Sequence, residues 1–398
     1  MTWSHLTQAA AQRSAAGLDR SLRSREQGEQ LLDLAGNDYL GLSDDPRVVA
    51  AAQEALRAWG AGATASRLIT GSIRLHEDLE AALAAYFGAA GALVFSSGYL
   101  ANLAAITALA DDETLIVSDA FNHASIVDAC RLSRADVVIV PHRDIAALSH
   151  ALEANNRRRA LVVTESVFSV DGDAADLSGL YEVSSRHGAA LLVDEAHSFG
   201  VVGEGGSVAA AGLAGREDIV ITATLSKAAG AQGGAIIAAQ PVIEHLINTA
   251  RPLIFDTGLA PAATAAALAA VRIMTTDPDR CAKVREAARR IHGLAVARGL
   301  EAAAPDGAVV SVVLPDARGG VAERERWRSR QILVGLFRPP SVPDGRSRLR
   351  LTAKATLTES DFEHIDSALA GVPTEVILPE TEPGPSRGRG VTATIASP

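Results

Sequence analysis

The sequence predicts an α/β fold in which a large domain is built on a mainly parallel seven-stranded sheet and is followed by a smaller C-terminal α+β domain. Its 398 residues exceed the roughly 250–300 residues at which a single hydrophobic core stops growing. Short apolar runs rich in β-forming residues alternate with stretches in which apolar residues have helical spacing. Such alternation is typical of a parallel sheet covered by helices on both faces.

Seven apolar runs are the predicted strands of the larger sheet. The intervals between the first six are long enough for a helix, and Leu75–Phe87 and Leu177–His187 show helical spacing. Only nine residues separate the last two runs, so we expect the seventh strand to pair antiparallel or to be reached by a loop. The runs are Ala92–Ser96, Leu115–Asp119, Asp136–Val140, Ala160–Glu165, Ala190–Asp194, Asp218–Thr224 and Gly234–Ala239.

The two ends of the chain are predicted to lie outside the larger domain. The N-terminal segment has no apolar stretch like that of a secretory signal, and we expect it to form a helix. The expected division is a helix and arm in 1–45, the large domain in 46–277, a small domain in 278–375 and a disordered, Pro- and Gly-rich tail in 376–398. The elements expected in the small domain are Arg280–Arg298, Val309–Leu314, Arg348–Thr352 and Glu359–Ala370.

Composition excludes several classes of protein. The chain has 37 Lys+Arg against 47 Asp+Glu, a net charge of −10, which disfavours nucleic acids and anionic membranes as partners. No apolar run approaches the roughly 18–20 residues of a membrane span. The two cysteines form no CxxC pair, and HExxH, GxGxxG and P-loop motifs are absent, which disfavours metal, dinucleotide and nucleotide sites. We therefore expect a cytoplasmic protein with no metal.

Lysine is rare in this chain. Only Lys227, Lys283 and Lys354 occur among the 37 basic residues, and a lysine retained where arginine is otherwise used can perform chemistry that a guanidinium cannot. Lys227 follows the sixth predicted strand, at the sheet edge where ligands bind in open α/β folds. A lysine with a lowered pKa at such an edge can form a Schiff base with an aldehyde cofactor, the alternative being an ordinary loop lysine.

Polar residues at neighbouring strand ends fit the same cofactor. Asp194 ends an apolar strand, where it can pair with the pyridine nitrogen of pyridoxal phosphate (PLP), the alternatives being a helix N-cap or a structural ion pair. His197 can reach the phenolic oxygen of that cofactor, or be a satisfied loop histidine. His123 can stack on a planar ring, or simply begin a helix with Asn122 as its cap.

Two further features suit anionic groups. The pattern of Ser96–Asn102 predicts a strand end followed by a helix start. The free N–H groups of that helix start, with the hydroxyls of Thr224 and Ser226, would form a phosphate cup. The alternative is an ordinary helix cap by Ser96 or Ser97. Arg348 and Arg350 alternate along a short strand and so face the same side. One of them can bind a carboxylate, unless both are solvated charges on an edge strand.

Six segments together carry a resemblance that each alone would not. In their order and spacing the chain resembles the α-oxoamine synthase family of fold-type-I PLP-dependent transferases, from about Asp33 to Ala370. The segments are NDYLGL (37–42), SSGYLAN (96–102), NHAS (122–125), ESVFSVDGD (165–173), LVDEAH (192–197) and TLSKAAGAQGG (224–234).

The resemblance implies a role for each residue around the cofactor ring. Lys227 would hold PLP and remove the Cα proton of the amino acid. Asp194 would pair with the pyridine nitrogen, and His197 and Ser169 would contact the phenolic oxygen. His123 would stack on the ring.

The resemblance also implies the anion contacts. The amides of Gly98 and Tyr99, with Thr224, would bind the phosphate. Asn37 and Arg350 would hold the substrate carboxylate, and Arg20 is placed as an N-terminal substrate arginine. In this family two copies share each site, which implies a homodimer in which Thr257 reaches the partner's phosphate.

One segment bears on the substrate. Residues 338–343 resemble the RPPTVP of the family branch that condenses a pimeloyl thioester, on coenzyme A or acyl carrier protein, with L-alanine to give 8-amino-7-oxononanoate for biotin. The alternatives are the glycine C-acetyltransferase and 5-aminolevulinate synthase types, or a non-catalytic partner subunit. Ser198 and Phe199 replace the smaller residues usual in the family, and we expect them to narrow the acyl entrance.

Overall fold

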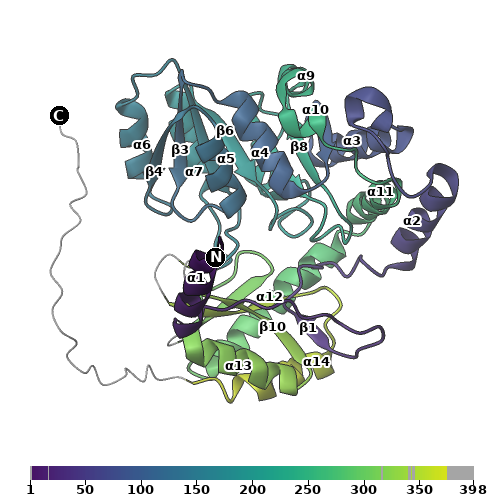
Figure 1. Cartoon of the computed structure of the whole chain (residues 1–398), viewed down its shortest axis with the longest axis vertical. Helices are drawn as coiled ribbons and strands as arrows, with labels where there is room; N and C mark the ends of the chain where they lie inside the picture. Colours follow the sequence, from purple (N-terminus) through teal and green to yellow (C-terminus); the bar gives the residue numbers. More distant parts are fainter. Residues whose placement is uncertain (1, 17, 315–316, 339–341, 343–345, 374–398) are drawn as a thin grey trace.

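The computed structural model describes residues 2–16, 18–314, 317–338, 342 and 346–373. Figure 1 shows two β-sheets, each with its own helices, in separate parts of the molecule. The tail predicted for 376–398, and most of the segment 338–343, lie outside the described residues.

The larger sheet has seven strands in the order β2-β8-β7-β6-β5-β3-β4. All neighbours pair parallel except β8, which is antiparallel to both β2 and β7. Of the two outcomes expected from the short connection before β8, antiparallel pairing is the one observed. The strands are β2 (Gly91–Phe95), β3 (Thr114–Asp119), β4 (Asp136–Val140), β5 (Arg159–Glu165), β6 (Ala190–Asp194), β7 (Ile219–Thr224) and β8 (Gly234–Ala238).

Helices cover both faces of this sheet. Alternate residues of β5 enter different cores: Val162 packs in one, and Leu161 and Val163 in the other, as a strand's two-residue period requires. The helices of this part are α2 (Pro46–Trp59), α3 (Arg74–Phe87), α4 (Gly98–Leu109), α5 (Ala124–Leu132), α6 (Ile145–Glu153), α7 (Leu177–Arg186), α8 (Gly206–Ala210), α9 (Gln240–Thr249), α10 (Arg251–Phe255) and α11 (Pro261–Thr276), with a π-helical turn at Arg67–Gly71.

The smaller sheet has four strands in the order β1-β10-β11-β9. Two of them, β9 (Val309–Leu314) and β11 (Ser347–Thr352), were predicted, whereas β1 (Leu32–Leu34) and β10 (Ile332–Phe337) were not. Its helices are α12 (Asp279–Ala297), α13 (Ala317–Ser329) and α14 (Glu359–Leu369), and the expected N-terminal helix is α1 (Ser4–Ala15).

Among the described residues, no helix combines the length and apolar character needed to cross a membrane. That part of the chain also holds no group of three or more His, Cys, Asp or Glu side chains arranged to bind a metal ion.

A glycine sets how closely β8 approaches α4. A Cβ at Gly234 would lie 2.3 Å from the carbonyl oxygen of Ser97 and 2.4 Å from the amide nitrogen of Gly98. Gly233, with φ of 130°, adopts a conformation that side chains disfavour. The glycine-rich stretch therefore lets the antiparallel strand lie against the start of α4.

Gly234→Ala should destabilise the protein by about 1–3 kcal/mol, because the added methyl group meets backbone that cannot move without shifting α4. Gly293→Ala is the matched control: it lies within α12, its Cβ would meet nothing within 4 Å, and it should stabilise by about 0.5–1 kcal/mol. Chemical denaturation of the two variants would measure both changes. Equal stability of Gly234→Ala and the parent would contradict this packing.

Candidate active site

The carboxyl ends of four strands bring together four of the predicted site residues and Glu165. Glu165 ends β5, Asp194 ends β6 and Thr224 ends β7, and these strands are neighbours in the sheet. His123 follows the end of β3, on the other side of β5. Lys227 lies three residues beyond Thr224, so one sheet edge carries the whole set.

Lys227 begins a chain of hydrogen bonds that reaches the smaller sheet. Its Nζ lies 2.8 Å from Nε2 of His197, whose Nδ1 lies 2.6 Å from the hydroxyl of Tyr39. The Tyr39 hydroxyl donates to Oδ1 of Asn37 at 3.2 Å, and Arg350 donates to the same oxygen at 3.0 Å. Each contact is satisfied if neutral His197 accepts from Lys227 at Nε2 and donates from Nδ1 to Tyr39.

Burial sets the protonation states along this chain. It lowers the pKa of Lys227 to about 8, with Arg350 acting in the same direction and Asp194 and Glu165 opposing it. Burial, followed by the charge of Lys227, lowers the pKa of His197 well below its usual value. Burial raises the pKa of Tyr39 to about 12. The lowered pKa therefore makes the reactive, uncharged form of this amine accessible around pH 8, beside a neutral histidine.

Asp194 is held by donors on both carboxylate oxygens. Oδ1 accepts from the amide of Ala196 at 2.8 Å, and Oδ2 accepts from the side-chain amide of Asn102 at 2.7 Å. Asn102 is itself fixed, since its Oδ1 accepts from the hydroxyl of Thr222 at 2.7 Å. The carboxylate therefore points in one direction and keeps lone pairs free for a cationic partner.

The Asn102 amide also reaches the His123 loop. It donates to Oγ of Ser125 at 2.9 Å, which lies 2.8 Å from Nδ1 of His123. His123 is the N-cap of α5, because its Nδ1 accepts from the Ser125 amide at 3.2 Å. Asn122 is not the cap: its side chain is buried and bonds to the carbonyl of Val163 at 2.8 Å.

The helix start and the two hydroxyls named for the phosphate cup lie close together, and the helix start also has an ordinary cap. Ser97 caps α4 by accepting from the amide of Leu100, as an ordinary N-cap does. Thr224 and Ser226 place their hydroxyls 2.8 Å apart beside this helix start. A Cβ at Gly98 would lie 2.9 Å from the Thr224 side chain, so the space above the helix start depends on glycine.

Arg348 and Arg350 are not solvated edge charges. Their strand β11 lies between β10 and β9, and the two residues are only 7% and 4% exposed. Arg348 pairs with Asp171 at 2.9 Å. Arg350 lies over the ring of Phe337, and its Nε is buried without a hydrogen-bond partner among the described atoms. A buried guanidinium with an unused donor is suited to an incoming carboxylate.

Glu165 is a buried acid that the sequence did not single out. Burial raises the pKa of its carboxyl well above the usual value, and the nearby Asp194 adds to the effect. Lys227 and backbone hydrogen bonds from His123 and Ser169 act in the opposite direction. Its Oε1 has no partner in the described structure. Glu165 is therefore a neutral acid able to donate a hydrogen bond.

A cleft of about 620 Å³ lies beside the His123 loop. Arg20 lines this cleft together with Phe121, His123, Ser169 and Phe337, so the structure brings the N-terminal arginine to the same cavity as the ring-stacking candidate.

Two other predicted residues, Tyr99 and Thr257, lie apart from the Lys227 chain. Tyr99 is 42% exposed and donates to Asp128 at 2.5 Å. Thr257 is exposed and pairs with Ser66 in an isolated bridge.

The expectation for Ser198 and Phe199 was wrong. Both are buried inside the large domain, where Phe199 packs on Phe87 with ring centroids 5.2 Å apart. Ser198 Oγ lies 2.6 Å from Oγ of Ser166 and does not face the cleft. Both side chains therefore pack in the interior of the large domain.

The residues present fit PLP. They offer a lysine amine with a lowered pKa, a fixed carboxylate at Asp194 and a helix start with adjacent hydroxyls, which match the aldehyde, the pyridine nitrogen and the phosphate of that cofactor. Sequence reasoning missed Tyr39, Asn102 and Glu165, although all three lie within motifs that carried the resemblance.

Comparison with known proteins gives the same result. The family model for aminotransferase class I and II matches residues 29–369. The 8-amino-7-oxononanoate synthase of Mycobacterium sp. (strain JLS) is 53% identical over 370 residues, covering 92% of this chain and 96% of that protein.

Two solved structures are similar over most of the chain. The serine palmitoyltransferase of S. paucimobilis, with bound PLP, has a TM-score of 0.86 at 31% identity and covers 93% of this chain and 96% of its own. The 8-amino-7-oxononanoate synthase of Francisella tularensis has a TM-score of 0.73 at 26% identity, with coverages of 85% and 97%.

These matches extend over nearly the full length of each partner, so they are not confined to one motif. The resemblance predicted from the six segments is confirmed, and PLP is the cofactor. The chain belongs to the class I and II aminotransferase family, which has the PLP fold type I, and within it to the α-oxoamine synthases.

Proposed function

We propose that this protein condenses L-alanine with a pimeloyl thioester to give 8-amino-7-oxononanoate, the free thiol carrier and CO2. The observation that carries the proposal is the hydrogen-bonded chain from Lys227 through His197 and Tyr39 to Asn37 and Arg350. It joins a reactive amine to a carboxylate-binding guanidinium within one site. The 53% identical relative from Mycobacterium sp. (strain JLS) supports this choice of substrates.

Lys227 is proposed to hold the cofactor and then to move the Cα proton of the amino acid. PLP, when bound, supplies an electron sink for the pair left at Cα by proton or CO2 loss. His197 receives a hydrogen bond from Lys227 and stays neutral, so it does not compete for that proton. Asp194, held by Asn102, is proposed to pair with the pyridine nitrogen, and His123 to cover the ring.

The amino acid is proposed to bind through its carboxylate. Arg350 would contact it with the unused Nε, while Asn37 fixes the other end of the guanidinium. Holding the carboxylate orients the Cα–H bond toward Lys227. Ser169 is proposed to contact the phenolic oxygen, and Gly98, Tyr99 and Thr224 the phosphate, as the resemblance implies.

We also propose that two copies share each site. Thr257 is exposed and follows α10, which packs against the π-helical turn at Arg67–Gly71. Phe255 and Ile69, on these two elements, are 68% and 75% exposed, which is unusual for large apolar side chains. A second copy on this surface would bury them and bring Thr257 toward the partner's phosphate site. We further propose that the protein is located in the cytoplasm.

The proposed division of the chain follows the two sheets. We place the large PLP-binding domain at 46–277 and the small domain at 278–375, with 1–45 as a helix and arm. The arm contributes β1 to the smaller sheet, where Leu32 pairs with Ile332, and Asn37 to the site.

Purified protein should release coenzyme A from pimeloyl-CoA in the presence of L-alanine and show visible absorption from lysine-bound PLP. Borohydride should fix the label on the peptide containing Lys227. Lys227→Arg should abolish both signals, because a guanidinium does not form the Schiff base. Lys283→Arg, an exposed position on α12, should leave both unchanged. Turnover only with glycine and acetyl- or succinyl-CoA would instead assign the chain to the alternative activities.

The rate of PLP capture by the apoprotein should rise with pH around a midpoint near 8. Only the neutral amine reacts, and burial lowers the pKa of Lys227 to about 8 from an ordinary 10.5. Stopped-flow absorbance between pH 6.5 and 9.5 measures this midpoint. A midpoint above 10 would show that the amine is not desolvated as described.

Arg350→Gln should raise the KM for L-alanine by roughly 10–100-fold, the effect expected for losing a charged hydrogen bond to the carboxylate. The KM for pimeloyl-CoA should change much less. Arg290→Gln, which removes an exposed ion pair with Glu359, is the matched control and should behave like the parent. An equal rise in both KM values for Arg350→Gln would contradict a specific carboxylate contact.

A further inference from the structure

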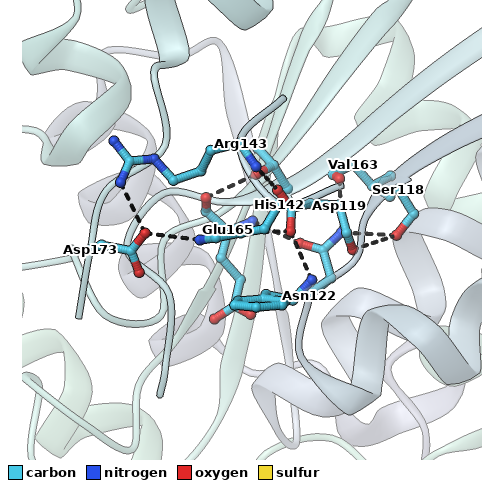
Figure 2. Close-up of polar contacts among 10 residues, drawn as sticks. Ser118, Asp119, Asn122, His142, Arg143, Val163, Glu165 and Asp173 are labelled. Carbon is cyan, nitrogen blue, oxygen red and sulfur yellow. Dashed lines mark hydrogen bonds and ion pairs between the residues drawn. The ribbon is translucent and has the colours of Figure 1, made fainter. Parts of the chain in front are cut away.

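His142 forms a second polar centre near the cleft, outside the Lys227 chain. Figure 2 shows it between two carboxylates: its Nδ1 lies 2.9 Å from Oδ1 of Asp119, and its Nε2 lies 2.9 Å from Oδ2 of Asp173. A neutral imidazole carries one N–H and would set its other nitrogen lone pair against a carboxylate. Only an imidazolium donates to both, so the geometry indicates a charged histidine.

The surroundings stabilise that charge. Phe121 stacks on the ring with centroids 4.1 Å apart, and the edge of Phe168 closes the other side at 4.4 Å. Among the described residues, Arg143 is a further charged group at this pair, and it donates to Asp173 at 3.1 Å. Burial alone would lower the pKa of the imidazole, but the hydrogen bonds and charges of Asp119 and Asp173 raise it to about 9.

The two carboxylates belong to separate segments of the site wall. Asp119 also accepts from the amide of Phe121 at 2.7 Å and so shapes the 119–123 loop that ends in His123. Its other oxygen accepts from the amide of Arg143 at 2.8 Å, and Arg143 has the unfavourable φ of 58°. The backbone is thus held in a strained conformation at this centre.

Asp173 belongs to the turn formed by residues 166–175, which carries Ser169. This turn is fastened to the smaller sheet as well: Asp171 pairs with Arg348, and the carbonyl of Gly172 accepts from the amide of Asp306 at 3.0 Å. A Cβ at Gly172 would lie 2.4 Å from the carbonyl of Val309, so the turn lies directly on β9. His142 therefore connects the His123 loop to the turn that rests on the arginine-bearing sheet.

We propose that His142 is a positioning residue whose imidazolium holds the 119–123 loop and the 166–175 turn at the spacing that the cofactor requires. The link to the cofactor rests on the proposed function, whereas the clamp itself does not. Because the folded-state pKa is raised, the contribution of the clamp to the free energy of unfolding is complete below about pH 6.5 and is lost as the pH rises through about 9.

The test compares His142→Gln with His150→Gln, an exposed histidine on α6, in the holoenzyme. Ring ¹⁵N spectra of the ten histidines should contain one imidazolium that persists to about pH 9 and is missing only from His142→Gln. At pH 7, amide hydrogen exchange should accelerate in 119–123 and 166–175 of that variant alone. PLP release, followed after rapid desalting, should be about tenfold faster, the order expected for one charged hydrogen bond.

Each of these measurements can overturn the proposal by itself. A spectrum in which His142→Gln removes no imidazolium, or unchanged exchange in both segments, would refute the clamp. Unchanged PLP release despite faster exchange would refute the positioning role. If the parent protein held no PLP, the proposed function would fail, while the spectra and the exchange would still decide the clamp. Asp173→Asn leaves His142 in place but should lower the pKa of its imidazole and accelerate amide exchange in the same two segments. An unshifted His142 pKa in that variant would also refute the clamp.

Discussion

The site depends on the removal of the Lys227 amine from water. In water this amine would be protonated and unreactive at neutral pH, whereas burial lowers its pKa to about 8. The surroundings must then tolerate a nearby positive charge without neutralising it by a salt bridge. They do so with a neutral histidine at 2.8 Å and with the Asp194 carboxylate, whose two oxygens accept hydrogen bonds from Ala196 and Asn102. Arg350 adds a second buried positive charge, which opposes protonation of the lysine.

This electrostatic arrangement requires two parts of the chain to meet. Lys227, Asp194 and His197 come from the larger sheet, whereas Arg350 comes from the smaller one. Asn37 joins them, since it lies on the arm just after β1 and bonds to both Tyr39 and Arg350. The N-terminal arm is therefore a structural component of the site.

Much of this was predictable because its signals are local. Apolar runs of five to seven residues identify the strands of the larger sheet, and a nine-residue gap is too short for the usual helical crossover, which left antiparallel pairing of β8 as one of two expected outcomes. Lys227 and Asp194 stand out because each follows such a run. In contrast, β1 has three residues and pairs with a strand about 300 positions away, so no local pattern reveals it. The burial of Arg348 and Arg350 escaped prediction because it depends on β10, which was also missed.

The residues that sequence reasoning missed share a physical cause. Tyr39, Asn102 and Glu165 resemble ordinary core or helix residues in the sequence. Their part in the site comes from the groups that they contact or influence, such as His197, Asp194 and Lys227. Asn102 occupies a turn of α4 that faces β6 and β7, and only the three-dimensional fold places its amide against Asp194. A carboxylate that is to pair with a cofactor needs such a donor, because an unsupported buried charge would be too costly. Sequence motifs can therefore identify the groups that react, whereas the groups that set their charge become visible only from their contacts.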